Sequence, residues 1–289
     1  MITVFTPTYN RAHLLPRLYE SLCTQSFKNF EWVIVDDGST DDTKCLSLSL
    51  SSREGTFFPI RYFYQENGGK HRAINRGVRE ARGELFFIAD SDDMLPPDAL
   101  ESVARVYDDI KDDASFAGVC GLDGDYNGNV IGSGLPKSII DDNSINIRFK
   151  YGITGDMKEV FRTEVLKEFP FPEIDGEYFC PEMMVWNRIA AEYKLRFLNQ
   201  IVYLAEYQVD GITSSIIKAR MNSPIASMMT YVELNRCNIP FVSKIKAAIN
   251  YWRFRFCSKK AEKPQLDWRY YWTMPVGFLM YKRDQRTVK

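Results

Sequence analysis

Three aspartates fall within four positions of the stretch FFIADSDDML, directly after an apolar run that predicts the end of a buried strand. Like charges this close repel one another, and a divalent cation removes that cost. Asp90, Asp92 and Asp93 offer the hard oxygen ligands that suit Mg²⁺ or Mn²⁺, and such an ion usually completes its shell with water and phosphate oxygens. The stretch therefore predicts a metal site for a phosphorylated substrate.

The same stretch has a simpler structural interpretation. Ser and Asp favour helix N-caps, so one of these residues could cap the helix that begins at Pro96-Pro97. Three aspartates together exceed what capping needs. A calcium-binding loop is disfavoured, because the Gly and Glu that it requires downstream are absent.

Two more carboxylates, Asp36 and Asp37, close another apolar run and lead into DDGSTDDT. They could form an Asx-type turn before a helix. A carboxylate at a strand end could equally accept hydrogen bonds from a nucleoside's ring N–H or its ribose hydroxyls. The residues leave both interpretations open.

The stretch ENGGKHRAIN places two glycines before Lys70 and His71 at a predicted helix start. Glycines that allow close backbone approach, a helix N-terminus and a cation together favour an anionic group, and a diphosphate would fit. Gly-Gly is also an ordinary turn, and a lone histidine such as His71 is more often structural than catalytic.

Alternating strands and helices must position these residues. The periodicity predicts strands at 2–6, 30–35, 60–65 and 84–89, separated by helices at 12–25, 41–50 and 70–82. This alternation predicts an α/β fold with a doubly wound, mainly parallel sheet and helices on both faces. Ligands of such sheets bind outside the carboxyl ends of the strands, where all the stretches above lie.

The pattern loosens after the helix at 96–110. Residues 116–136 are rich in Gly and turn formers, and the following region predicts a helix at 181–193 and a strand at 195–207. We expect one domain at 1–216, with a nucleotide-binding half (1–100) and an acceptor-binding half (101–216), and a basic helical extension at 217–289.

The motifs TPTYNR, VDDGSTDDT, NGGKHRAINRGVREARGE, ADSDD and the PE of FCPEMMVW, in this order over about residues 1–215, resemble family 2 glycosyltransferases with the GT-A fold. The resemblance implies an inverting transferase that moves a sugar from a nucleoside diphosphate donor, commonly uridine-based, to an acceptor hydroxyl. It also implies Mn²⁺ or Mg²⁺ as cofactor and a glycan or lipid-linked acceptor, as in polysaccharide or glycolipid assembly.

Residue by residue, the resemblance makes Asp37 the group that reads the base edge and places Asn67 and Lys70 beside the nucleotide. Asp92 and Asp93 match the aspartates that contact ribose and metal, and Asp90 begins the DxD triplet. The wall against the nucleobase would be formed by Thr6, Pro7, Thr8 and Tyr9.

The resemblance makes Glu182 the general base that removes the acceptor's proton, which typically contributes ~10²–10⁴-fold. Many relatives have Glu-Asp there, whereas this chain has Glu182-Met183. Judged by its position alone, Glu182 would be a first-turn helix residue after Pro181 that favours the helix dipole.

Two weaker sites follow. Gly155 and Asp156 lie in a predicted turn before a strand, where relatives contact donor sugar or acceptor; an ordinary turn explains them as well. Asp210, flanked by Glu206 and Thr213, lies on a predicted loop that could close over the diphosphate, although such loops need no function.

The composition is that of an ordinary globular protein, with 289 residues of which 45% are hydrophobic. No secretory signal and no run long enough to span a bilayer is visible, so we expect a cytoplasmic protein, at the inner face of a membrane if it binds one. The six cysteines show no CxxC pair, which suggests reduced thiols.

Charge is distributed unevenly along the chain. Residues 1–240 carry 25 Lys/Arg against 35 Asp/Glu, whereas 241–289 carry 12 against 3. Within 241–257 an apolar arc flanked by basic residues predicts peripheral membrane contact: Val242, Ile245, Ile249, Trp252 and Phe256, with Lys244, Lys246, Arg253 and Arg255. A helix packed on its own domain is the alternative, and the acidic body makes nucleic acid a poor partner.

Two other functions compete. A sugar-1-phosphate nucleotidyltransferase shares the sheet and the paired aspartates, but it would carry a Gly-rich basic loop after the first strand, where TPTYNRAHLLPRL has no glycine. A non-catalytic nucleotide- or glycan-binding domain would not need Asp92, Asp93 and Glu182 together.

Overall fold

The computed structural model describes residues 1–205, 215–260 and 262–287. The chain divides into two compact units, Met1–Pro170 with Glu192–Glu206, and Phe171–Ala191 with Tyr207–Lys289. Residues 171–191 thus group with the C-terminal helices, although they lie within the 1–216 segment that we expect to be one domain.

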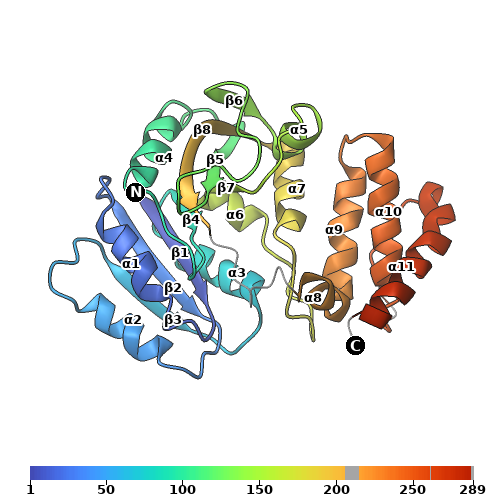
Figure 1. Ribbon diagram of the computed structural model, residues 1–289, viewed down its shortest axis with the longest axis horizontal. Helices are drawn as coiled ribbons and strands as arrows, with labels where there is room; N and C mark the ends of the chain where they lie inside the picture. Colours follow the sequence, from blue (N-terminus) through green and yellow to red (C-terminus); the bar gives the residue numbers. More distant parts are fainter. Residues whose placement is uncertain (206–214, 261, 288–289) are drawn as a thin grey trace. The chain divides into compact units, whose positions relative to one another are not determined.

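A mixed sheet of eight strands forms the centre of the first unit as described (Figure 1), in the order β3-β2-β1-β4-β7-β5-β8-β6. Four of its seven pairings are parallel, which confirms the predicted α/β class with a mainly parallel sheet. The strands are β1 Ile2–Thr8, β2 Phe30–Asp36, β3 Ile60–Tyr64, β4 Leu85–Ile88, β5 Phe116–Gly124, β6 Ile139–Asp142, β7 Met157–Arg162 and β8 Lys194–Leu204.

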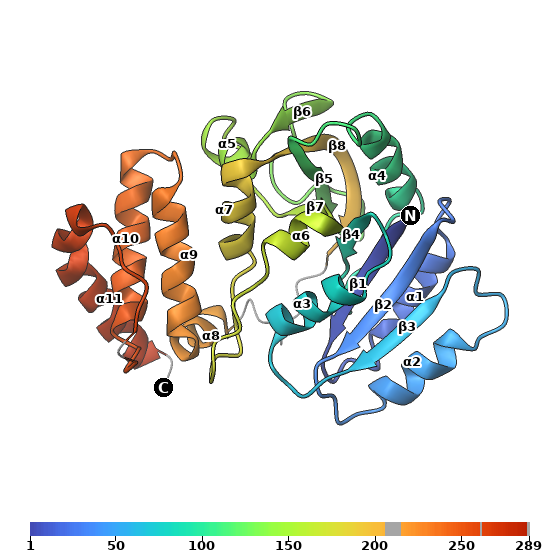
Figure 2. The same cartoon turned by 180° about the vertical axis from the view of Figure 1, so that it is seen from behind.

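The helices of this unit cover both faces of the sheet (Figures 1 and 2). On one face, Leu18 and Val103 pack with Val4 and Phe87. On the other, α3 lies over β1, where the rings of Phe5 and Phe86 stack with centroids 5.0 Å apart. The helices are α1 Leu15–Cys23, α2 Thr43–Ser51, α3 Lys70–Glu80, α4 Ala99–Asp108, α5 Ser144–Phe149 and α6 Thr163–Glu168.

The close approach of α3 to β1 depends on Gly77, where a Cβ atom would lie 2.2 Å from the Phe5 ring. We expect Gly77→Ala to lower the free energy of unfolding by about 1–2 kcal/mol, because overpacking outweighs the better helix propensity of alanine. Urea denaturation measures the change. Ser49→Ala on the exposed side of α2 is the control and should stay within about 0.5 kcal/mol; equal stability of Gly77→Ala and wild type would show that this contact is not tight.

The strand β5 runs through the region that the sequence predicts to be loose and turn-rich. Its glycines serve packing, since a Cβ at Gly121 would lie 2.3 Å from the side chain of Val202 on β8. The pairing of β5 with β8 also shifts register along its length. The turn-forming composition of this stretch therefore did not indicate that residues 116–124 form a fully buried strand.

The second unit is helical in its described part. The helices α9 and α10 pack around a core that includes Met228, Tyr251 and Phe254. Its elements are α7 Met183–Glu192, α8 Ile216–Asn222, α9 Pro224–Arg236, α10 Phe241–Arg255, the 3₁₀ helix η2 Trp268–Thr273, and α11 Met274–Thr287. No helix in the described part of the chain is both long and apolar enough to cross a membrane.

The N-terminus of α9 is held by Glu177, which is 4% exposed. Its two carboxylate oxygens accept hydrogen bonds from the backbone N–H groups of Ile225 and Ala226, at 2.8 and 2.9 Å. A carboxylate in this position satisfies N–H groups that the helix leaves unpaired and favours the positive end of its dipole.

Removing this carboxylate should destabilise the protein. We expect Glu177→Ala to lower the free energy of unfolding by about 2–3 kcal/mol, since two buried N–H groups lose their acceptors. Circular dichroism during urea denaturation measures it, with the exposed Glu262→Ala as control. A loss no larger than that of the control would remove Glu177 from this role.

The predicted membrane-facing arc of α10 is wrong for two of its five residues. Trp252 and Phe256 pack against α11: a Cβ at Gly277 would lie 2.4 Å from the Cβ of Trp252, and the rings of Phe256 and Phe278 have centroids 5.1 Å apart. Arg253 is also buried and forms an ion pair with Asp284. The packed-helix alternative therefore describes this part of the arc, whereas Val242 is 61% exposed.

Candidate active site

The carboxyl ends of β1, β2, β3 and β4 lie at one edge of the sheet, because these strands run parallel. At the end of β2, the Asp36 carboxylate accepts hydrogen bonds from the backbone N–H of Ser39 at 2.8 Å and from the Tyr62 hydroxyl at 2.7 Å. Asp36 thus forms the Asx-type turn that was one of the two open interpretations.

Asp37 organises the glycine-rich turn before α3. One carboxylate oxygen accepts from the side chain of Gln65 at 2.7 Å and the N–H of Gly68 at 3.0 Å. The other accepts from the N–H of Gly69 at 2.7 Å and the side chain of Asn67 at 3.3 Å. These four contacts all lie within the chain, and the role of Asp37 as reader of the base edge stays a prediction.

The end of β1 offers one exposed side chain of the four predicted to contact the nucleobase. Thr6 and Pro7 are buried, and the Thr6 hydroxyl accepts a hydrogen bond from the Trp32 indole at 2.9 Å. Thr8 is buried too, and its hydroxyl has no hydrogen-bond partner among the described residues. Tyr9 is 49% exposed, so its ring is the surface available for stacking.

Lys70 joins the start of α3 to the end of β4. Gly69, with φ +96°, precedes the helix, which has no side-chain cap. The Lys70 ammonium lies 2.7 and 2.9 Å from the two carboxylate oxygens of Asp90. Partial burial raises the pKa of Asp90, but Lys70 and then Lys158 hold it below its usual value.

Asp93 lies deeper and has a different environment. It is 7% exposed and accepts a hydrogen bond from the Tyr203 hydroxyl at 2.8 Å, and that hydroxyl also accepts from the backbone N–H of Asp90 at 2.7 Å. Burial and then the charge of Asp90 raise the pKa of Asp93 to about 7. Tyr203 thus fixes the turn that carries the aspartates.

Asp92 is held by its backbone. Its carbonyl oxygen accepts from the Arg17 guanidinium and from the Tyr126 hydroxyl at 3.0 Å. The guanidinium of Arg17 also stacks over the Tyr126 ring at 4.8 Å. The carboxylate of Asp92 makes no hydrogen bond or ion pair with the residues that the structure describes.

Two cations offset part of the repulsion within the cluster. Lys70 and Lys158 both favour the charged form of Asp90, whereas the charge of Asp90 still raises the pKa of Asp93. Within the described residues no group of three or more His, Cys, Asp or Glu side chains could hold a metal ion. The donor set nevertheless fits Mn²⁺ or Mg²⁺ bound by one or two carboxylates and substrate phosphate, because Asp92 is open and Asp93 would lose its raised pKa next to a cation.

Residues that sequence reasoning missed complete the cluster. Lys158 on β7 lies 3.4 Å from the centre of the Tyr203 ring and lowers the pKa of both Asp90 and Asp93. Asp123 on β5 is buried, one of its oxygens has no hydrogen-bond partner in the described chain, and burial raises its pKa to about 6. No local pattern indicates these residues, because strand pairing brings them in from far along the chain.

The weaker predicted sites have structural explanations or lie outside the description. Gly155, with φ +89°, packs against the backbone of Ile131, where a Cβ would lie 2.1 Å from the carbonyl oxygen. Asp156 beside it is exposed. Asp210, with Glu206 and Thr213 of the predicted lid, lies outside the described residues.

Glu182 belongs to the second unit, where it directly precedes α7. Its carbonyl oxygen accepts from the N–H of Val185 at 2.9 Å and of Trp186 at 3.1 Å, so Glu182 opens the helix as its position in the sequence predicts. The residue is half-buried, and Met183 after it is exposed.

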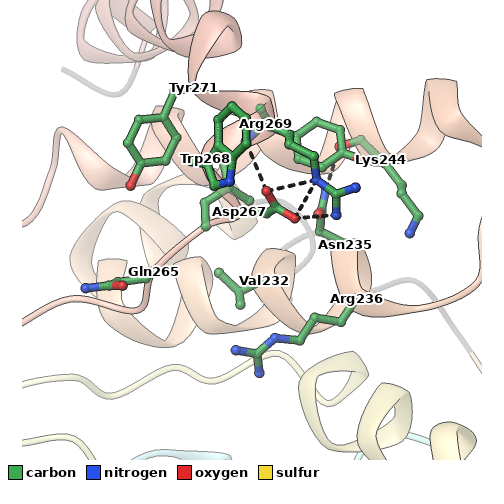
Figure 3. Close-up of a pocket in the computed structure, with 11 residues that line it drawn as sticks. Val232, Asn235, Arg236, Lys244, Gln265, Asp267, Trp268, Arg269 and Tyr271 are labelled. Carbon is green, nitrogen blue, oxygen red and sulfur yellow. Dashed lines mark hydrogen bonds and ion pairs between the residues drawn. The ribbon is translucent and has the colours of Figure 1, made fainter.

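A pocket of about 750 Å³ lies within the second unit, between the end of α9, the start of α10 and η2 (Figure 3). Arg236, Lys244 and Arg269 line it together with Trp268 and Tyr271. The acidic residue that lines it, Asp267, accepts hydrogen bonds from the Arg269 guanidinium at 2.6 to 3.1 Å. None of the predicted site residues lines this pocket.

Residues 3–167 match the family model described as glycosyl transferase family 2. The chain is similar to the GalNAc(5)-diNAcBac-PP-undecaprenol beta-1,3-glucosyltransferase of Campylobacter jejuni, with 28% identity over 219 residues, 73% of this chain and 67% of that protein. It spans only about a quarter to a third of the length of other curated relatives, 24% and 36% in two cases.

Two solved structures share the fold. S. aureus TarS 1-349 in complex with UDP-GlcNAc has a TM-score of 0.65 and 21% identity, with 88% of this chain and 72% of that chain covered. The mannosyltransferase PcManGT of Pyrobaculum calidifontis in complex with GDP-Man and Mn²⁺ has a TM-score of 0.58 and 18% identity, with 99% and 75% covered.

Proposed function

The chain belongs to glycosyl transferase family 2, and we propose that it transfers a sugar from a nucleoside diphosphate donor to a glycan or lipid-linked acceptor. The proposed nucleotide is UDP, and the configuration of the anomeric carbon is inverted in the transfer. The TarS complex with UDP-GlcNAc supports the donor class. The Campylobacter relative, named for an undecaprenol-linked substrate, supports the acceptor class. We include peripheral membrane contact through residues 217–289 in this proposal.

The observation that carries the proposal is the arrangement of strand ends in the first unit. The Asp37 carboxylate holds the turn at 65–69, which follows β3. This turn places Lys70 against Asp90 at the end of β4, three strands along the sheet. An ammonium, an uncapped helix start and an open Asp92 carboxylate then converge on one edge of the sheet. This combination suits a diphosphate and its counter-ion.

Lys70 would stabilise the leaving group. As the bond between the anomeric carbon and the diphosphate breaks, negative charge grows on the phosphate oxygens, and an ammonium at this edge offsets it. Asp92 and Asp93 would hold Mn²⁺ or Mg²⁺, whose chemistry there is to offset the same charge. Tyr203 and Arg17 would position the aspartates, Tyr203 through the Asp93 carboxylate and Arg17 through the Asp92 carbonyl oxygen.

Glu182 would take the proton of the acceptor hydroxyl as that oxygen attacks the anomeric carbon from the face opposite the diphosphate. The carboxylate then becomes a carboxylic acid, and the new glycosidic bond has inverted configuration. Tyr9 would stack on the nucleobase, and Asp37 would act as a positioning residue that shapes the turn.

A panel of nucleotide sugars tests the proposal. Each is incubated with the full chain, with and without Mn²⁺, and released nucleoside diphosphate is measured in the absence and presence of glycan acceptors. We expect slow hydrolysis of one donor that Mn²⁺ accelerates and an acceptor accelerates further. Release of pyrophosphate from a nucleoside triphosphate and a sugar 1-phosphate would instead identify a nucleotidyltransferase.

A further inference from the structure

The segment formed by η2 and α11 exposes an unusual number of large apolar side chains. Trp272 is 61% exposed, Val276 44% and Leu279 67%. Because η2 ends at Thr273 and α11 begins at Met274, these residues project from one continuous helical segment. Most helices of a globular protein turn such residues toward a core.

These residues form a stripe on the outer side of the segment. Trp272, Val276, Leu279, Arg283 and Arg286 recur at intervals of 4, 3, 4 and 3, which keeps them on one side of a helix. The opposite side, with Gly277 and Asp284, is buried. The outer stripe, defined here as these five residues, therefore has the spacing of a packed helix face but is not covered within the described chain.

The exposed charges of α11 are all of one sign. The exposed charged side chains of α11 are Lys282, Arg283 and Arg286. Its acid, Asp284, is 3% exposed and engages Arg253 of α10. The outer stripe thus passes from aromatic and aliphatic residues into cations over about 20 Å of helix, with no exposed acid on α11.

We propose that the outer stripe docks on a bilayer surface that contains anionic lipids. Tryptophan favours the boundary between headgroups and acyl chains, Val276 and Leu279 can enter the apolar side of that boundary, and arginine stems extend back to the phosphates. An acidic protein partner would match the cations but not the apolar residues at the other end of the stripe. The inference rests on the proposed membrane contact of residues 217–289 and moves that contact from α10, where Trp252 and Phe256 are packed, to α11.

Vesicle sedimentation of the full chain tests it, with vesicles of phosphatidylcholine alone and of phosphatidylcholine with phosphatidylglycerol. We expect wild type to bind the anionic vesicles and to leave the neutral ones largely free. The double variant Trp272→Ala/Leu279→Ser should lower the partition coefficient about tenfold, and Arg283→Gln/Arg286→Gln should lower it similarly and weaken its dependence on salt. Leu48→Ser, at an exposed leucine on α2 of the other unit, is the control and should bind like wild type.

Three results would overturn the inference: no binding of wild type to anionic vesicles, unchanged binding of the stripe variants, or equal binding to both vesicle types. Conversion of a dimer into a monomer by the stripe variants, with vesicle binding unaltered, would assign the stripe to a second copy of the chain. Thermal melts followed by circular dichroism confirm that each variant is folded. Donor hydrolysis without vesicles is measured in parallel, so a failure of docking and a failure of the proposed transferase activity are seen separately.

Discussion

Replacing Glu182 by glutamine should lower kcat for sugar transfer by about 10²–10⁴-fold, the contribution of a positioned general base. Glutamine preserves the size of the side chain and its place before α7 but cannot accept the acceptor's proton. The dissociation constant of the donor should stay within about twofold, since the proposed role of Glu182 concerns the acceptor. Transfer assays at saturating donor and calorimetric titration of the donor measure the two quantities.

The matched control for this variant is Glu192→Gln, at the exposed end of α7, the helix that Glu182 precedes. It makes the same Glu→Gln change of charge and should leave kcat unaltered. Transfer by Glu182→Gln at the wild-type rate would assign the base to another residue.

Lys70→Met should lower kcat by about 10²–10³-fold, because the variant removes a cation aimed at the charge that develops on the leaving group. The structure provides a competing explanation, since the same variant leaves Asp90 without the ammonium at 2.7 Å. The double variant Lys70→Met/Asp90→Asn separates the two. It removes the unbalanced carboxylate and should remain as inactive as Lys70→Met alone.

Recovery of activity in the double variant would show that Lys70 only balances Asp90. Lys137→Met is the matched control, since Lys137 is exposed and lies outside the cluster, and it should behave like wild type. Steady-state kinetics with one donor and one acceptor are sufficient for all three variants.

The sequence predicted the N-terminal half of the sheet well for a physical reason. Each of β1, β2, β3 and β4 is a short apolar run followed by a helix, so local periodicity carries the information, and parallel pairing then brings their ends to one edge. The prediction that Lys70 and the DSDD turn belong to one site follows from that rule. The 2.7 Å contact between Lys70 and Asp90 agrees with it.

The remaining features of the fold and the site depend on contacts between distant parts of the chain, which local periodicity does not reveal. The hydroxyl that fixes the aspartates comes from Tyr203, more than 100 residues later, and Lys158 comes from an antiparallel strand inserted between β4 and β5. Asp37 illustrates a different limit. Its position at a strand end was predicted, but whether its oxygens face a ligand or its own turn depends on the geometry of residues 65–69.

The membrane-contact prediction for the arc of α10 failed for a similar reason, since it depended on contacts with a distant part of the chain. A stripe of apolar residues beside cations has the same pattern whether a bilayer or another helix covers it, and only the close approach permitted by Gly277 of α11 decides between them. The exposed counterpart on α11 is interrupted by Gly277, Asp284 and basic residues, so its sequence gives a weaker apolar signal than that of α10.

Calorimetric titration of UDP into the full chain, with Mn²⁺ and then with a chelator, tests the central claim that the strand-end cluster binds a nucleoside diphosphate with its counter-ion. The account predicts that Mn²⁺ tightens binding at least about tenfold and that Asp92→Asn abolishes this gain, whereas Asp112→Asn on an exposed turn preserves it. Binding of UDP that is equal with Mn²⁺ and with chelator, and unaffected by Asp92→Asn, would contradict it.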